Sequence, residues 1–171
     1  DGSVAGRFVG LVRASNMQTD TLKDDRVYLA PSISWRGERS NLTLLASYQH
    51  DKTGSSQQFL PLAATLLAPP GRRLDPSTFI GDPGFDRIDS RVYSLTALFD
   101  HSFNDVLSLR SALRYIDGRT TLQQMYVDSY SNPADPFIDA ARRVVNRTAY
   151  GTRPDVQILS ADNALQFDFA T

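Results

Sequence analysis

Residues 26–51 read RVYLAPSISWRGERSNLTLLASYQHD, and this stretch decides the expected fold. Apolar and polar residues alternate on both sides of a short polar centre, residues 36–40. One face of the alternation receives Val27, Leu29, Ile33, Trp35, Leu42, Leu44, Ala46 and Tyr48, and the other receives Arg26, Tyr28, Ser32, Ser34, Asn41, Thr43, Ser47 and Gln49. Because successive side chains of a strand point to opposite faces, the alternation predicts a β-hairpin with one apolar and one polar face.

The same alternation recurs along the rest of the chain, so we predict about six strands in all. The further segments are residues 4–14, 88–100, from about 106 into the 120s, and 155–170. Leu45, Val92 and Leu98 interrupt the pattern, because they fall among the polar residues. The connections are in turn long, short, long, short and long: residues 15–24, 36–40, 52–87, 101–105, and a last one that extends to Pro154.

The alternation of long and short connections favours a membrane barrel. Structureless loops longer than about 12–15 residues are uncommon in compact soluble domains. Outer-membrane barrels instead have short periplasmic turns at one end and long extracellular loops at the other. On the apolar faces, Trp35, Phe99, Phe167 and Phe169 lie beside the short turns or the last segment, and Tyr48, Tyr93 and Tyr115 lie toward the long loops. Two aromatic belts around an apolar band are typical of a lipid-facing barrel.

The predicted fold class is therefore all-β: an antiparallel up-and-down meander that forms part of a transmembrane β-barrel. Two alternatives remain open at this point. A soluble β-barrel or sandwich ligand-binding module would turn the same apolar faces inward. A passive porin-type channel would use the same amphipathic strands without active import.

Composition excludes several functions. The net charge of −1 leaves no basic excess for nucleic acid. No cysteine is present, and no apolar run approaches the roughly 18 residues of a membrane-spanning helix. His50 and His101 fall at opposite ends of the predicted strands, and neither a Gly-x-Ser-x-Gly elbow nor a phosphate-binding glycine loop occurs. We expect no enzyme, no catalytic residue, no metal site and no bound cofactor.

Several segments resemble, in the same order along the chain, the TonB-dependent siderophore receptor family, and its ferrichrome-type members in particular. The segments are Tyr28–Trp35, Leu42–Gln49, Phe59-Leu60-Pro61, Phe79–Arg87, Asp100–Asp105 and Leu109–Tyr115. The resemblance implies a bacterial outer-membrane receptor that binds ferric siderophores at its extracellular face and imports them with energy transmitted by TonB. Its implied partners are the ferric siderophore, the TonB complex acting through a plug domain, and outer-membrane lipid.

The resemblance also implies that residues 1–171 are one part of a larger domain. Barrels of this kind have about 22 strands and a plugged lumen. We therefore expect residues 1–171 to be an internal piece of the barrel, with the plug domain and the remaining strands outside it.

The resemblance further suggests ligand contacts. Phe59 matches a loop aromatic before Leu-Pro, Tyr126 matches an aromatic beyond the fifth strand, and Tyr130 is a further candidate. A ring covers the organic shell of a bulky chelate, although packing of the loops alone also accounts for such aromatics. Ser55, Ser56, Gln57 and Gln58 stand where related receptors carry further aromatics, which leaves the identity of the siderophore open.

The charged residues outside these contacts have both structural and functional interpretations. Arg72-Arg73 and Arg142-Arg143 lie in predicted long loops, where they suit either solubility or attraction of an anionic chelate. Arg26, Arg110 and Arg114 lie on the predicted lumenal face and would meet either a plug or water. For the carboxylates of Asp24, Asp25 and residues 82–89 we expect solvated loop charge, because no calcium-loop spacing occurs.

Overall fold

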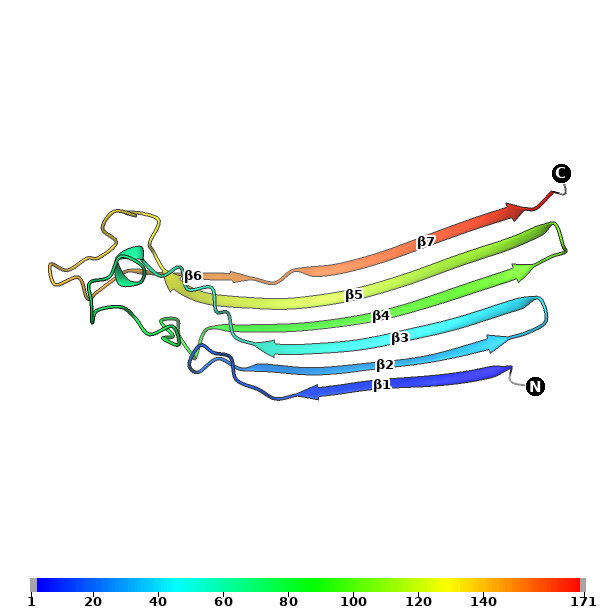
Figure 1. The fold of residues 1–171 in the computed structure, drawn as a ribbon, viewed down its shortest axis with the longest axis horizontal. Helices are drawn as coiled ribbons and strands as arrows, with labels where there is room; N and C mark the ends of the chain where they lie inside the picture. Colours follow the sequence, from blue (N-terminus) through cyan, green and yellow to red (C-terminus); the bar gives the residue numbers. More distant parts are fainter. Residues whose placement is uncertain (1–2, 170–171) are drawn as a thin grey trace.

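The computed structural model describes residues 3–169 and consists almost wholly of long strands (Figure 1). The strands are β1 (Val4–Arg13), β2 (Asp24–Arg36), β3 (Ser40–Thr53), β4 (Arg87–Ser102), β5 (Leu107–Val127), β6 (Arg147–Thr152) and β7 (Asp155–Phe167), and one short 3-10 helix, η1 (Leu62–Ala64), interrupts the longest loop. Strands β1 to β5 pair antiparallel in chain order, and both β6 and β7 pair with β5. The predicted all-β antiparallel meander is confirmed.

The predicted hairpin of residues 26–51 forms, and its apolar and polar residues lie on opposite faces. Trp35 lies opposite Leu42, and Tyr28 lies opposite Gln49. A tight turn at residues 37–39 joins the strands, and Gly37 donates its backbone N–H to the carbonyl of Ser40 at 2.8 Å. All short turns lie at one end of the sheet and all long loops at the other (Figure 1).

Strand β6 departs from the sequence-based expectation, which extended the last loop to Pro154. Leu122 opposes Thr152 and Arg119 opposes Asp155, so β6 and β7 keep one register against β5. Proline has no backbone N–H to donate, and this interrupts the strand at Pro154. The carbonyl of Pro154 still accepts the N–H of Thr120 at 3.1 Å. The last two strands are thus one long strand with a proline break, and the preceding loop is shorter than predicted.

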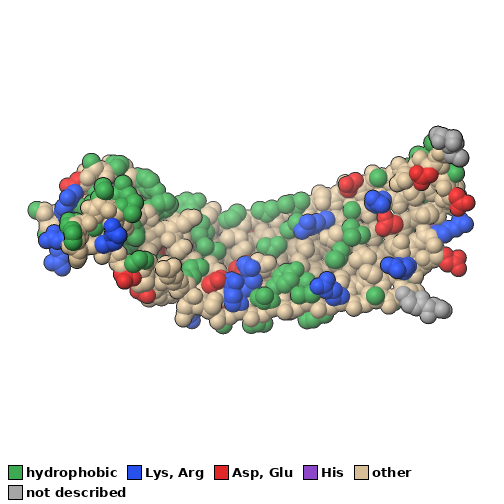
Figure 2. Space-filling model, viewed as in Figure 1, with side chains coloured by type: hydrophobic (Ala, Val, Ile, Leu, Met, Phe, Trp, Pro, Cys, Tyr) green, Lys and Arg blue, Asp and Glu red, His purple; other side chains and the backbone are tan. Residues whose placement is uncertain are grey.

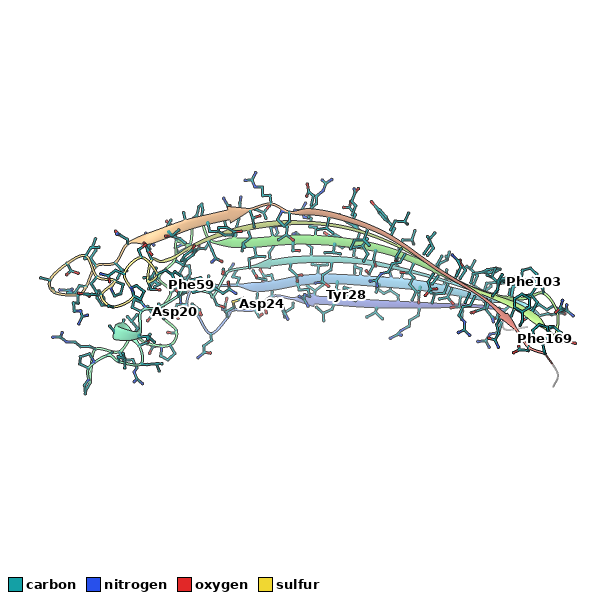
Figure 3. All side chains as sticks on the ribbon, turned by 90° about the horizontal axis from the view of Figure 1, so that it is seen from above. Asp20, Asp24, Tyr28, Phe59, Phe103 and Phe169 are labelled. Atoms are coloured by element: carbon teal, nitrogen blue, oxygen red, sulfur yellow. The ribbon has the colours of Figure 1, made fainter. Side chains whose placement is uncertain are left out.

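The sheet is strongly curved, and η1 and the longest loop lie on its concave side (Figure 3). The polar face is the concave one, because Gln124 on that face contacts Ser55 of the loop. Along β4, Tyr93 and Leu95 are 50% and 55% exposed, whereas the intervening polar side chains are half-buried. The apolar side chains therefore lie on the convex side and do not converge on a core.

The register also places apolar and polar residues of all the long strands on opposite faces. The leucine-rich set Leu29, Ile33, Trp35, Leu42, Leu44, Leu95, Leu107, Leu109 and Phe167 shares the apolar face, and Gln49, Ser94, Arg110 and Arg114 share the polar face. Among residues 3–169 the buried apolar side chains are Leu22 and Val127, both at the loop end. Dense packing thus occurs between the loops and the strand ends.

Aromatic and charged side chains mark two levels on the convex face. The rings of Tyr48 and Tyr93 lie 5.0 Å apart on neighbouring strands. Two residues further toward the loops, His50 contacts Asp89 at 2.9 Å, and Arg91 lies 3.6 Å from the same carboxylate. The apolar band therefore ends near the tyrosines. Within residues 3–169, none of the helical structure has the length and apolarity to cross a membrane.

Candidate ligand-binding site

Three aromatic rings meet at the loop end of the sheet. Phe59 belongs to the loop between β3 and β4, Tyr126 is the penultimate residue of β5 and lies within that strand rather than beyond it, and Tyr130 belongs to the next loop. The Phe59 ring lies 5.1 Å from that of Tyr126 and 5.3 Å from that of Tyr130, and both contacts are edge to face. We call these three residues the aromatic cluster. The structure thus brings together the three residues that the sequence suggests as ligand contacts.

The cluster presents apolar surface to solvent. Phe59 is 40% exposed and Tyr130 is 60% exposed, although both belong to residue types that usually lie inside proteins. Edge-to-face pairing keeps ring faces available on the outer side, since each ring offers only an edge or one face to its neighbour. Such a surface suits contact with a bulky organic shell.

The backbone at Phe59 is strained. Its φ of 49° lies in the left-handed region, which costs a non-glycine residue on the order of 1 kcal/mol or more. Hydrogen bonds fix the preceding residue, Gln58, in the loop. Its side chain is buried, donates to the carbonyl of Thr78 at 2.8 Å and accepts the N–H of Ile80 at 2.5 Å. Its own carbonyl accepts the N–H of Val127 at 3.3 Å.

A second buried contact ties the same loop to β5. The Ser55 hydroxyl donates to the side-chain oxygen of Gln124 at 2.8 Å, and both residues are buried. A buried hydrogen bond of this kind contributes about 1 kcal/mol, and leaving one partner unpaired costs more. Ser55 and Gln58 therefore position the aromatic cluster. No local sequence pattern indicates this role, because a polar residue in a loop is expected to be solvated until its partner is known.

Asp86 corrects the expectation that the loop carboxylates are merely solvated. It accepts the backbone N–H of Asp82 at 3.0 Å and also that of Met125 in β5. A Cβ on Gly81 would overlap an Asp86 carboxylate oxygen, so the carboxylate and the loop backbone pack closely. Other carboxylates predicted as solvated are also engaged: Asp24 pairs with Arg13, and Asp89 with His50.

The arginines of the polar face have mixed surroundings. Arg26 forms an ion pair with Asp51 across β2 and β3, and Arg110 lies 3.3 Å from Asp100. Arg114 lines a hollow on the concave face together with Arg7 and Ser94. Figure 2 shows such charged side chains spread along the sheet. Within residues 3–169, no group of three or more His, Asp or Glu side chains is placed to hold a metal ion.

Comparison with known proteins relates the chain to siderophore receptors. It is 29% identical over 163 residues to the ferrioxamine B receptor of Salmonella typhimurium strain SL1344, an alignment that covers 95% of this chain and 22% of that protein. It is also 29% identical over 182 residues to the ferrichrome outer membrane transporter/phage receptor of Escherichia coli K12, covering all of this chain and 24% of that protein. No protein-family model matches. The chain thus spans less than a quarter of the length of these relatives.

Solved structures of two receptors have the same fold as this chain. The open form of the ferric-catecholate import receptor Fiu of E. coli K12 superposes over all of this chain and 28% of its own, with a TM-score of 0.82 and 20% identity. The ferric preacinetobactin receptor BauA of Acinetobacter baumannii covers 99% of this chain and 24% of its own, with a TM-score of 0.72 and 14% identity. The predicted resemblance and the predicted barrel fold are confirmed.

Proposed function

We propose, from this homology to outer-membrane siderophore receptors, that the chain is a segment of a receptor barrel that binds ferric siderophores and imports them with TonB-transmitted energy. The observation that carries the proposal is the aromatic cluster. It stands at the loop end of a curved sheet whose polar face is concave. This is where a barrel presents its extracellular mouth.

An outer-membrane location is supported by the exposed convex face. Strands β1 to β5 have 10 to 21 residues, and a strand needs about 9–11 residues to cross a bilayer. The excess lies beyond the tyrosine level, where Asp89, Arg91 and Arg119 share the convex face. Lipid would therefore cover the apolar band, and the charged ends of the strands would stand in the headgroups or in water.

The aromatic cluster would provide part of the ligand contact. Phe59 contacts both Tyr130, which belongs to a different loop, and Tyr126, which belongs to a rigid strand. A ligand seated there would touch two loops and the scaffold together, which is a common arrangement for loop-borne binding sites. No chemical step is required of these rings. Their role is to bury the organic shell of a chelate.

Import needs parts outside this chain. Residues 1–171 would form one portion of the barrel domain, and the plug through which TonB acts would come from elsewhere in the receptor. The concave face would then line a plugged lumen, where side chains such as Arg114 and Ser94 offer charge and hydrogen bonds. In the rival porin-type channel this face would line open water instead.

Uptake in cells distinguishes a TonB-dependent receptor from a passive channel. The complete protein is expressed in the outer membrane of a siderophore-free strain, with and without functional TonB, and uptake of radioactive ferric chelates is measured. Saturable uptake that stops without TonB supports the receptor. Uptake that rises linearly with concentration and ignores TonB overturns it in favour of the channel.

A further inference from the structure

The two longest loops enclose a cavity that is separate from the aromatic cluster. Its volume is about 430 Å³, and it lies between η1 with its following turn and residues 137–147. Tyr126 and Val127 are consecutive in β5, so their side chains leave the strand on opposite sides. Val127 lines the cavity, whereas Tyr126 belongs to the cluster. The cavity is therefore a second surface.

Arginines give this cavity its character. Arg72 comes from the first loop, and Arg142, Arg143 and Arg147 come from the second loop and the start of β6. Among the lining residues in the described chain, none is acidic. Figure 2 shows Lys and Arg side chains gathered over this loop end. Folding thus brings Arg72 into one cavity with Arg142 and Arg143, which lie about 70 positions further along the sequence.

Two of these arginines are held in place by the protein. Arg142 pairs with Asp135 at 3.1 Å and lies 5.3 Å above the Phe137 ring. Arg147 donates to the carbonyls of Ile80 at 3.2 Å and Gly81 at 2.9 Å. Backbone carbonyls hold the side chain of Arg147 without neutralising its charge. The carboxylate of Asp135 offsets part of the charge of the group, and that of Asp139, beside the backbone of Arg143, offsets a further part.

The other two arginines carry the charge that is left. Arg72 and Arg143 are exposed, and within residues 3–169 neither guanidinium forms a hydrogen bond or an ion pair. Asp139 lies close to Arg143, but its carboxylate accepts the backbone N–H groups of Arg143 and Val144 at 2.8 and 2.7 Å. Like charges gathered in one cavity repel one another, and an anion bound between them relieves that repulsion.

The remaining wall is apolar. Phe137, Val127 and Ile80 line the same cavity as the arginines. A small inorganic anion would leave this wall uncovered, whereas a molecule with anionic oxygens on an organic frame would use both surfaces. The planar guanidinium matches paired oxygens of carboxylates and similar groups in a two-point contact.

We propose that this loop cavity captures the anionic oxygens of a catecholate- or carboxylate-type ferric chelate. The proposal rests on the proposed function and names its substrate class. Capture at the loops raises the local concentration of an anionic ligand above the barrel mouth, which increases its association rate. A neutral chelate gains nothing from this cavity.

The test uses the complete receptor, purified in detergent, with an anionic ferric triscatecholate and a neutral ferric trishydroxamate as probes. The variants are Arg143→Gln, Arg143→Lys and Arg72→Gln. The matched control is Arg73→Gln, because the Arg73 guanidinium donates to the carbonyls of Thr65 and Leu66 and does not line the cavity. Circular dichroism of each variant confirms that the barrel is folded.

We expect Arg143→Gln and Arg72→Gln to raise the Kd of the triscatecholate about tenfold each, the loss of one charge-assisted hydrogen bond. Arg143→Lys retains part of the affinity, Arg73→Gln retains all of it, and the Kd of the trishydroxamate stays unchanged throughout.

Two results overturn the cavity while leaving the proposed function intact. One is an unchanged Kd of the triscatecholate in both glutamine variants, and the other is equal weakening of both probes. A parent receptor that binds no triscatecholate also overturns the cavity, and the uptake experiment decides the proposed function separately.

Discussion

The ring of Phe59 lies edge to face against that of Tyr126, with centroids 5.1 Å apart, although 67 positions separate the two residues. The contact joins a loop to the end of the longest strand. Phe59 has a left-handed backbone, and the buried side chain of the preceding Gln58 is hydrogen-bonded to Thr78 and Ile80 of the same loop. The position of the loop and the position of the proposed ligand contact are therefore coupled.

Removing either ring of this pair should weaken ligand binding. We expect Phe59→Ala and Tyr126→Ala in the complete receptor to reduce the binding free energy of its ferric siderophore by about 1–3 kcal/mol each. Barrel assembly should persist, because the strands remain. The double variant should show coupling of about 0.5–1.5 kcal/mol, as aromatic pairs do. Phe103→Ala, in a short turn at the far end, serves as the control, and unchanged affinity in both single variants would refute these contacts.

Two leucines of β4 offer a matched test of the faces. Leu95 lies on the convex face and Leu98 on the concave face. An arginine in the lipid-facing band costs about 2–4 kcal/mol at the bilayer centre, and much less in a hydrated lumen. Leu95→Arg should therefore lower the yield of folded receptor in lipid bilayers far more than Leu98→Arg. Equal yields would contradict the lipid-facing assignment.

The close approach of Gly81 and Asp86 predicts a local defect. Gly81→Ala places a methyl group against the carboxylate that anchors the loop to Met125. Overpacking of this kind costs about 1–3 kcal/mol. Faster cleavage of the loop of residues 54–86 by trypsin, in a folded barrel, is the expected result. Gly84→Ala is the control, since its nearest neighbour is the end of a flexible side chain at 3.3 Å. Matching cleavage rates for the two variants would show that the contact is dispensable.

Acid should loosen the loop of residues 128–146. The pKa of Asp139 is lowered from its ordinary value of 3.8, chiefly because the backbone N–H of Val144 donates to the ionised carboxylate. A lowered pKa means that the ionised group stabilises the folded loop above the ordinary value, and that this contribution is lost as pH falls through the lowered pKa. Asp128, which holds Ser131, is shifted in the same direction.

Pepsin cleavage measures this effect, with rates normalised to an unstructured peptide between about pH 5 and pH 2. We expect cleavage in the loop to rise steeply toward the acid end. In Asp139→Asn the normalised rate should be higher near pH 5 and rise less toward the acid end, because only the contribution of Asp128 remains to be lost. If the cleavage rate of the parent receptor did not change with pH, Asp139 would not be the group that stabilises the loop.

The chain by itself should be a poor soluble protein. Strands β1 and β7 each have an unpaired edge, and the convex face exposes large apolar side chains. Both features promote aggregation in water. Refolding of residues 1–171 without detergent should give sedimenting aggregates, and detergent should increase the dissolved fraction. A monodisperse monomer with a cooperative melting transition would contradict this expectation.

The sequence by itself determined the strands and their faces. In residues 26–51 each side chain's neighbour lies on the opposite face, so alternation alone separates Leu29 from Tyr28. The alternation is a local signal, so it can be recognised without knowing which strands pair. The alternation did not reveal β6. This strand has only six residues and is largely polar, so in the sequence it resembles a loop.

Only the tertiary structure decided how the loops meet. Nothing local indicates that Ser55 reaches Gln124, that Asp86 reaches Met125, or that Arg72 shares a cavity with Arg143. Each contact joins residues dozens of positions apart, and it forms because the β-ladders bring the ends of β3, β4 and β5 side by side. A loop residue has no periodicity to reveal its partner, so its role follows from where the strands deliver it.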